Sequence, residues 1–148
     1  MTLKERLTGD MKTAMKAKDR ERLSVVQLVR AAILQVEKDK QIALDDPGIL
    51  EIIAREVRQR REAIEEYKKY DAQPAIEKLN REVAILREYL PQQLSLDEIR
   101  QMVAEAVEQT KAAGPRDMGK VMSVLMPKVR GRADGKVVNH LVKEALGQ

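Results

Sequence analysis

The sequence predicts an all-α fold, in which an N-terminal helical bundle is followed by a smaller C-terminal helical domain. Apolar residues recur every three or four positions over most of the chain, a spacing that places them on one face of a helix. No stretch alternates apolar and polar residues as a half-buried strand would. Of the 148 residues, 43% are apolar and 35% are charged, and the chain has no Cys, Phe or Trp. This composition is typical of a helical protein with an aliphatic core, and it excludes disulfides and thiolate metal sites.

The first part of the chain is predicted to form four helices. Thr2 with Glu5 matches the capping-box pattern at the start of the first helix, and Asp19 can cap the second, because these side-chain oxygens can accept hydrogen bonds from the free N–H groups of a first helical turn. Asp45-Asp46-Pro47 indicates the start of the third helix, and Gln73-Pro74 restarts the chain for the fourth. Arg60 interrupts the apolar stripe of the third helix. We expect its charged end to extend outward along its own stem or to mark an interface.

A domain boundary is predicted near Pro91, which ends the fourth helix. Residues 1–91 would form the N-terminal helical domain, and residues 92–148 the C-terminal helical domain. Ser95 and Glu98 then match the capping-box pattern, in which each of two side chains bonds the backbone of the other residue. This pattern opens the next helix.

Three helices are predicted in the C-terminal domain. We expect Gly114-Pro115 to close the fifth helix, and Asp117 and Asp134 to cap the sixth and seventh. Pro127 should kink or stop the sixth helix, because proline lacks a backbone donor. Methionines at every fourth position of that helix are expected to fill the core rather than to form an adaptable groove for a partner. These methionines are Met118, Met122 and Met126.

Positive charge is concentrated in one segment of the predicted C-terminal domain. Residues 116–136 carry six basic and two acidic residues, and their net charge of +4 equals that of the whole chain. Every second position from 128 to 132 is basic: Lys128, Arg130 and Arg132. Lys136 follows at the positive N-terminal end of the seventh helix, where backbone N–H groups also favour anions. The pattern indicates a phosphate-binding surface, with a merely solvated basic face as the alternative.

The run from Gly114 to Lys120 matches the first seven positions of the G-x-x-x-x-G-K phosphate-loop pattern. Val121 stands where that pattern places a Ser or Thr to bind magnesium, and the run follows a predicted helix, whereas a phosphate loop follows a strand. His140 is the single histidine, and a lone histidine does not define an acid–base site. We therefore expect no nucleotide, cofactor or metal site, no catalytic residues, and no catalytic activity of this chain alone.

The location of the protein follows from its hydropathy. No apolar run approaches the roughly 20 residues needed to span a bilayer. The first residues also lack the apolar core of a signal peptide. We expect a cytoplasmic protein with no membrane partner.

Several short runs of the sequence carry a family resemblance. They are Leu3-Lys-Glu-Arg-Leu7, Glu88-Tyr-Leu-Pro91, Gln93-Leu94, Asp117-Met-Gly-Lys-Val-Met122, Leu125-Met-Pro-Lys128, Gly131-Arg-Ala-Asp-Gly-Lys136 and Val138-Asn139. Together these runs resemble the YqeY family over the whole chain. The C-terminal runs are also similar to the tail domain of the B subunit of the glutamyl-tRNA(Gln)/aspartyl-tRNA(Asn) amidotransferase.

The resemblance implies a tRNA-binding accessory module that stands alone. In the amidotransferase the related tail contacts tRNA, while glutamine hydrolysis and transamidation reside elsewhere. A label of carbon–nitrogen ligase with glutamine as amide donor would therefore be inherited from the larger relatives. The resemblance assigns contacts with the phosphates of tRNA or another structured RNA to Lys120, Lys128, Arg130, Arg132 and Lys136. It assigns shaping of the backbone to Gly119, Gly131 and Gly135.

Two other functions are compatible with the sequence. The chain could be an adaptor that docks on an amidotransferase or an aminoacyl-tRNA synthetase, through the apolar flank of the sixth helix or the interrupted stripe of the third. It could also be an amidotransferase by itself, which the missing nucleotide and glutaminase motifs disfavour.

Overall fold

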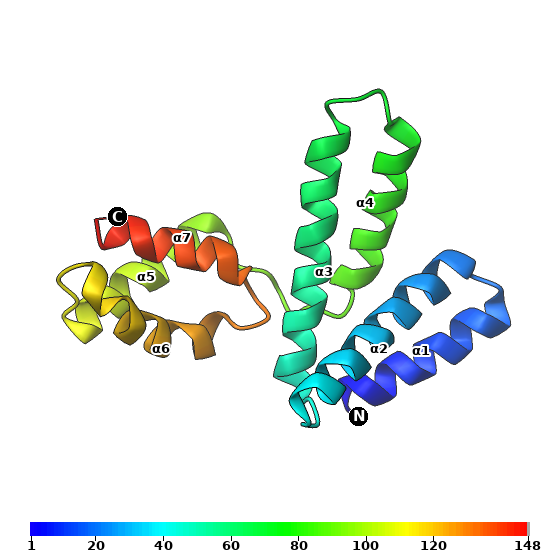
Figure 1. Cartoon of the computed structure of the whole chain (residues 1–148), viewed down its shortest axis with the longest axis horizontal. Coiled ribbons are helices and arrows are strands. Elements are labelled where there is room, and N and C mark those ends of the chain that lie inside the picture. Colours follow the sequence, from blue (N-terminus) through cyan, green and yellow to red (C-terminus); the bar gives the residue numbers. More distant parts are fainter. Residues whose placement is uncertain (148) are drawn as a thin grey trace. The chain divides into compact units, whose positions relative to one another are not determined.

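The computed structural model describes residues 1–147 and contains, within them, seven α-helices, one 3-10 turn and no strand. The prediction of an all-α fold is confirmed. The helices form two compact units, Met1–Leu90 and Pro91–Gln148 (Figure 1). Each unit has a hydrophobic core of its own, so each can be described by itself.

The first unit consists of two helical hairpins (Figure 1). α1 (Leu3–Ala17) packs on α2 (Arg20–Lys40), and α3 (Asp46–Tyr67) packs on α4 (Gln73–Arg87). α2 also contacts α3 and α4, and this joins the two hairpins around one core. The largest fully buried side chains of this core come from all four helices and include Leu7, Val26, Ile49, Ile53 and Leu86.

The predicted start signals of the first three helices act as caps. Thr2 and Asp19 each accept a hydrogen bond from the backbone N–H three residues later, at 3.1 and 3.2 Å, and Asp45 does so at 2.9 Å. α1 ends where Lys18 takes a left-handed φ of 56°. Each side-chain cap stabilises its helix by about 1 kcal/mol.

Arg60 lies inside the first unit, so both expectations for it are wrong. Its side chain is only 11% exposed, and it donates hydrogen bonds to Glu56 at 2.8 Å and to Glu82 of α4 at 2.9 Å. The three side chains therefore form an internal ion-pair network that joins α3 to α4. The apolar stripe of one helix could not reveal this network, because Glu82 belongs to another helix.

The second unit is a bundle of three helices: α5 (Leu96–Thr110), α6 (Met118–Val129) and α7 (Gly135–Ala145). The 3-10 turn η1 (Pro115–Asp117) joins α5 to α6, and each of the three helices contacts the other two. Ser95 and Glu98 form the predicted capping box at the start of α5. The buried core of this unit includes Val103, Val121, Leu125, Val138 and Val142.

Two helix ends in the second unit differ from the prediction. α5 ends at Thr110, before Gly114, because Lys111 takes a left-handed φ of 55°. α6 continues through Pro127 to Val129, so Pro127 does not stop this helix. A proline inside a helix costs about 3 kcal/mol. Val129, which follows the proline, is almost completely buried, and burial of such a side chain contributes about 1.5–3 kcal/mol, which offsets much of that cost.

The methionines of α6 belong to the core, as predicted. They are partly buried and pack against the core cluster of the second unit. The apolar side of α6 therefore packs on its own unit, and its methionines remain partly exposed. These methionines are Met118, Met122 and Met126.

Replacement of Arg60 by alanine should destabilise the first unit by about 3 kcal/mol, because it leaves the carboxylates of Glu56 and Glu82 poorly solvated and without their counter-charge. Tyrosine fluorescence during urea unfolding reports on this unit, since all three tyrosines lie in it. Arg55→Ala, at an exposed position of the same helix, should change stability by no more than about 0.5 kcal/mol. Equal losses for the two variants would show that the network contributes nothing.

Candidate nucleic-acid interface

The segment that joins α6 to α7 carries most of the predicted phosphate contacts. Lys128 lies in the last turn of α6, Arg130 and Arg132 follow the helix, and Lys136 lies in the first turn of α7. We call residues 128–136 the cationic connection. Lys120 lies two turns earlier on α6, roughly 12 Å before Lys128 along the axis at 1.5 Å per residue. The structure therefore groups four of the five predicted contacts.

Gly131 makes the turn of the cationic connection. It is buried and has a left-handed φ of 77°, which costs other residues roughly 1–2 kcal/mol. The carbonyl of Val129 accepts hydrogen bonds from the backbone N–H groups of Arg132, at 2.8 Å, and Ala133, at 3.0 Å. The backbone of the connection is thus a closed turn.

The residues that precede α5 hold the same turn from another side. The Leu94 N–H donates to the carbonyl of Arg132 at 2.8 Å. The side-chain amide of Gln93 donates to the carbonyl of Gly131 at 3.0 Å and to that of Pro91 at 2.8 Å. This role of Gln93 was not predicted from the sequence. Its place in one of the family-like runs was the single signal that could have indicated it.

The charges of the cationic connection are only partly compensated. Lys128 is exposed and Arg132 is half-buried, and neither side chain has an ion pair within residues 1–147. Lys120, by contrast, lies 3.7 Å from the carboxylate of Asp117. An incoming phosphate would meet no competing carboxylate at Lys128 or Arg132, whereas at Lys120 it would compete with Asp117.

The start of α7 shows the predicted cap. Asp134 accepts a hydrogen bond from the Lys136 N–H at 2.9 Å. This bond fixes the first turn of α7 directly after the cationic connection. The side chain of Lys136 is therefore carried on an ordered helical turn.

The other two glycines with a predicted shaping role lie in helices. Gly119 is the second residue of α6, and Gly135 is the first residue of α7. A Cβ added at either position would meet no atom within 4 Å. Of these three glycines, only Gly131 has a backbone conformation that favours glycine.

The nucleotide-like run forms the corner between α5 and α6. Asp117 was expected to cap α6, but its carboxylate accepts a hydrogen bond from the Ala113 N–H at 2.9 Å and makes no cap bond to the helix. The Ala113 N–H, together with Lys120, lowers the pKa of Asp117 below its ordinary range. The run follows the helix α5 and includes the turn η1, whereas the loop of a nucleotide site follows a strand.

The described residues offer no other obvious centre for chemistry. Within residues 1–147, no group of three or more His, Asp or Glu side chains could hold a metal ion. No helix in the same range is long and apolar enough to cross a membrane. His140 is exposed, and its Nε2 lies 3.2 Å from a carboxylate oxygen of Glu144.

The fold and the site define a class of two-unit helical proteins with a hydrogen-bonded cationic connection in the smaller unit. Residues 4–146 match the sequence model of the YqeY family, described as Yqey-like protein. This chain therefore belongs to the YqeY family. The recognition made from short sequence runs is confirmed.

Individual relatives fall into two groups. The protein named "Altered inheritance of mitochondria protein 41, mitochondrial" from Pyrenophora tritici-repentis is 26% identical over 145 residues, which cover 96% of this chain and 80% of the relative. The E subunit of glutamyl-tRNA(Gln) amidotransferase is 44% identical over 50 residues in Methanospirillum hungatei and 42% identical over 57 residues in Thermococcus gammatolerans. The latter matches cover 34% and 36% of this chain but only 8% and 9% of those relatives.

Gly131→Ala should destabilise the second unit by about 1–2 kcal/mol, because alanine is strained at a left-handed φ. Gly119→Ala is the matched control, and it should leave stability unchanged or raise it by up to about 1 kcal/mol, since α6 has room for the methyl group. Hydrogen exchange of the buried amides of α5 and α6, followed by NMR, measures both effects. A Gly131→Ala variant as stable as the control would contradict the strained turn.

Proposed function

We propose that this protein is an RNA-binding accessory module, related to the tRNA-dependent amidotransferases, whose ligand is tRNA or another structured RNA. The observation that supports this proposal best is the cationic connection. The segment 116–136 carries a net charge equal to that of the entire chain, and the turn at its centre is fixed by hydrogen bonds from Gln93 and Leu94. Ordered cationic side chains suit the phosphate backbone, which supplies much of the affinity for nucleic acids.

The distribution of aromatic residues favours recognition of shape and phosphate. All three tyrosines lie in the first unit, and the chain has no Phe or Trp. The second unit therefore has no Phe, Tyr or Trp ring on which an unpaired base could stack. Contacts with phosphates and 2′-hydroxyls are the means by which proteins recognise folded RNA without such stacking.

The partial similarity to the E subunit of glutamyl-tRNA(Gln) amidotransferase supports tRNA as the RNA. Because this chain spans less than a tenth of those relatives, we do not extend their enzymatic activity to it. In this proposal the cationic connection holds phosphate groups and performs no chemistry on them. Carbon–nitrogen bond formation would belong to the larger relatives.

Simultaneous replacement of three basic residues of the connection by alanine should weaken tRNA binding by tenfold or more at physiological salt, on the order expected for the loss of phosphate contacts. For the wild type, log affinity should fall with log salt concentration at a slope of about −3 to −4 if four basic side chains contact phosphate. Removal of each phosphate contact should make the slope shallower by about 1. Fluorescence anisotropy of a labelled tRNA measures both quantities. The replaced residues are Lys128, Arg130 and Arg132.

Two further variants distinguish an effect of the cationic connection from a general effect of positive charge on RNA binding. A control triple variant removes the same charge from exposed positions elsewhere in the second unit and should bind nearly as well as the wild type. Gln93→Ala keeps every charge but loses the bond to Gly131, and it should weaken binding while leaving the salt slope unchanged. Equal affinities of the wild type and the connection variant would exclude the proposal. The control positions are Arg100, Lys111 and Lys143, with Asn in place of Ala at 111 because its φ is left-handed.

An adaptor that docks on an amidotransferase is the second candidate, and the same partial similarity supports it. Of the two surfaces expected for it, Arg60 is internal, and the apolar residues of α6 pack in part on the core of their own unit. Recovery of an amidotransferase with the tagged protein after nuclease treatment would favour the adaptor over the RNA-binding module.

A further inference from the structure

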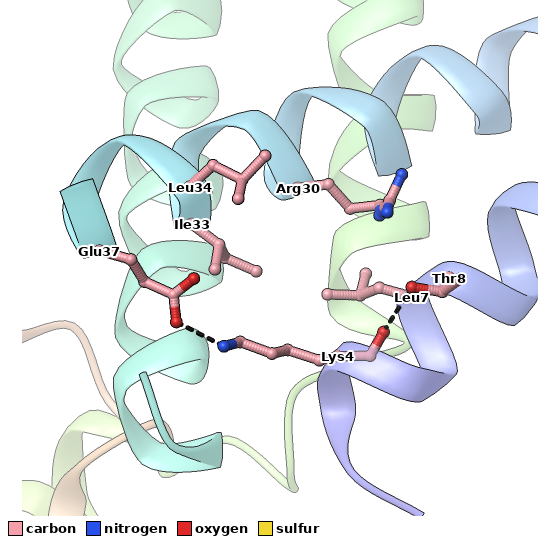
Figure 2. A pocket seen from close by; sticks show the side chains of 7 residues that line it. All are labelled: Lys4, Leu7, Thr8, Arg30, Ile33, Leu34 and Glu37. Carbon is pink, nitrogen blue, oxygen red and sulfur yellow. Dashed lines mark hydrogen bonds and ion pairs between the residues drawn. The ribbon is translucent and has the colours of Figure 1, made fainter. Parts of the chain in front are cut away.

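A pocket of about 210 Å³ lies between α1 and α2 in the first unit (Figure 2). The residues that line it follow helical spacing, three on α1 and four on α2. Each set therefore lies on one side of its helix, and the two sides face each other. The lining residues are Lys4, Leu7, Thr8, Arg30, Ile33, Leu34 and Glu37.

One end of the pocket is closed by an internally balanced ion pair. The Lys4 ammonium contacts the Glu37 carboxylate, which also accepts a hydrogen bond from the Leu44 N–H at 2.7 Å. Lys4 and this N–H keep the pKa of Glu37 below its ordinary range. Both charges of this pair are therefore already compensated at neutral pH.

Arg30, in contrast, has no carboxylate partner. Its half-buried guanidinium donates to the sulfur of Met11 at 2.8 Å, and within residues 1–147 it forms no ion pair. A thioether is a weak acceptor, and a guanidinium carries five N–H donors in a fork that fits a carboxylate. Figure 2 shows Arg30 at the end of the pocket opposite the Lys4–Glu37 pair. This cation is available to an anion from outside the chain.

The space between the two charged ends is apolar. Leu7 and Ile33 are almost completely buried, and they point toward each other in Figure 2. Leu34 lines the same pocket but is 65% exposed. The pocket is open to solvent at Leu34 and is smaller than the roughly 300 Å³ at which pockets for drug-sized ligands begin. It therefore suits a small aliphatic group, for which a six-carbon chain is a suitable probe.

We propose that this pocket binds an aliphatic carboxylate, with the carboxylate on the guanidinium of Arg30 and the hydrocarbon against Leu7, Ile33 and Leu34. A partly buried cation without a counter-charge usually lowers the stability of the folded protein. A bound carboxylate would supply this counter-charge to Arg30. A free aliphatic acid and the C-terminus of a peptide that ends in leucine share this chemistry. The proposal uses no residue of the cationic connection and is independent of RNA binding.

Titration of hexanoate into the isotope-labelled full chain, followed by NMR, tests the proposal. Amide signals of α1 and α2 around Leu7 and Ile33 should shift saturably. Hexanol and hexylammonium, which have similar chains but no carboxylate, should bind about tenfold more weakly or worse. A second series compares N-acetylglycylleucine with its C-terminal amide. If the peptide acid binds more tightly than hexanoate and the amide does not bind, the ligand is the C-terminus of a peptide. If hexanoate binds more tightly than the peptide acid, the ligand is a free aliphatic acid.

Arg30→Gln should weaken hexanoate binding by about tenfold or more. The melting temperature should stay close to that of the wild type, because the Arg30 guanidinium bonds only a thioether in the unliganded protein. Lys38→Gln removes the same charge from an exposed position one turn after Leu34, and it should leave hexanoate binding unchanged. The proposal is overturned if hexanoate causes no saturable shift, if hexanol binds equally well, or if Arg30→Gln binds hexanoate like the wild type.

Discussion

The hydrogen bonds between Gln93, Leu94 and the turn after α6 are the constraint on which the candidate RNA interface depends. A basic loop that is free in solution must lose conformational entropy when it binds, and this reduces its affinity. Here the backbone is already fixed by bonds from two directions and by the left-handed glycine at 131. In the proposed interface, binding would therefore require little further ordering of the backbone.

Some cationic side chains of this protein are paired with carboxylates, whereas those of the two candidate sites include cations without an ion pair in the part of the chain that the structure describes. Arg60 forms an ion pair with Glu56 at 2.8 Å, one turn away in the same helix. Arg22 forms one with Glu88 at 2.6 Å, and this pair joins distant parts of the sequence within the first unit. Arg30, Lys128 and Arg132 have no such partner within residues 1–147. Cations that a fold leaves uncompensated, on ordered helices or turns, are the places where an external anion gains most.

Membership of the YqeY family and the similarity to a small part of the amidotransferase E subunit set the context for these sites. In the proposed function the second unit holds phosphate at its charged turn, whose backbone is fixed by hydrogen bonds. The first unit adds a pocket of different chemistry, apolar between its charged ends. The two proposed ligands therefore differ: an RNA backbone for the second unit and a small carboxylate for the first.

The sequence alone determined the helices, most of their caps, the apolar faces and the family, because helical periodicity and capping depend on residues within about four positions of each other. It also located the cationic connection, since that charge lies in one short segment. Only the tertiary structure decided the partners of Arg60 and Gln93, which lie 22 and 38 residues away at Glu82 and Gly131. The same holds for the passage of α6 through Pro127, which depends on burial against neighbouring helices. Such interactions depend on how the helices pack, and no local pattern contains that information.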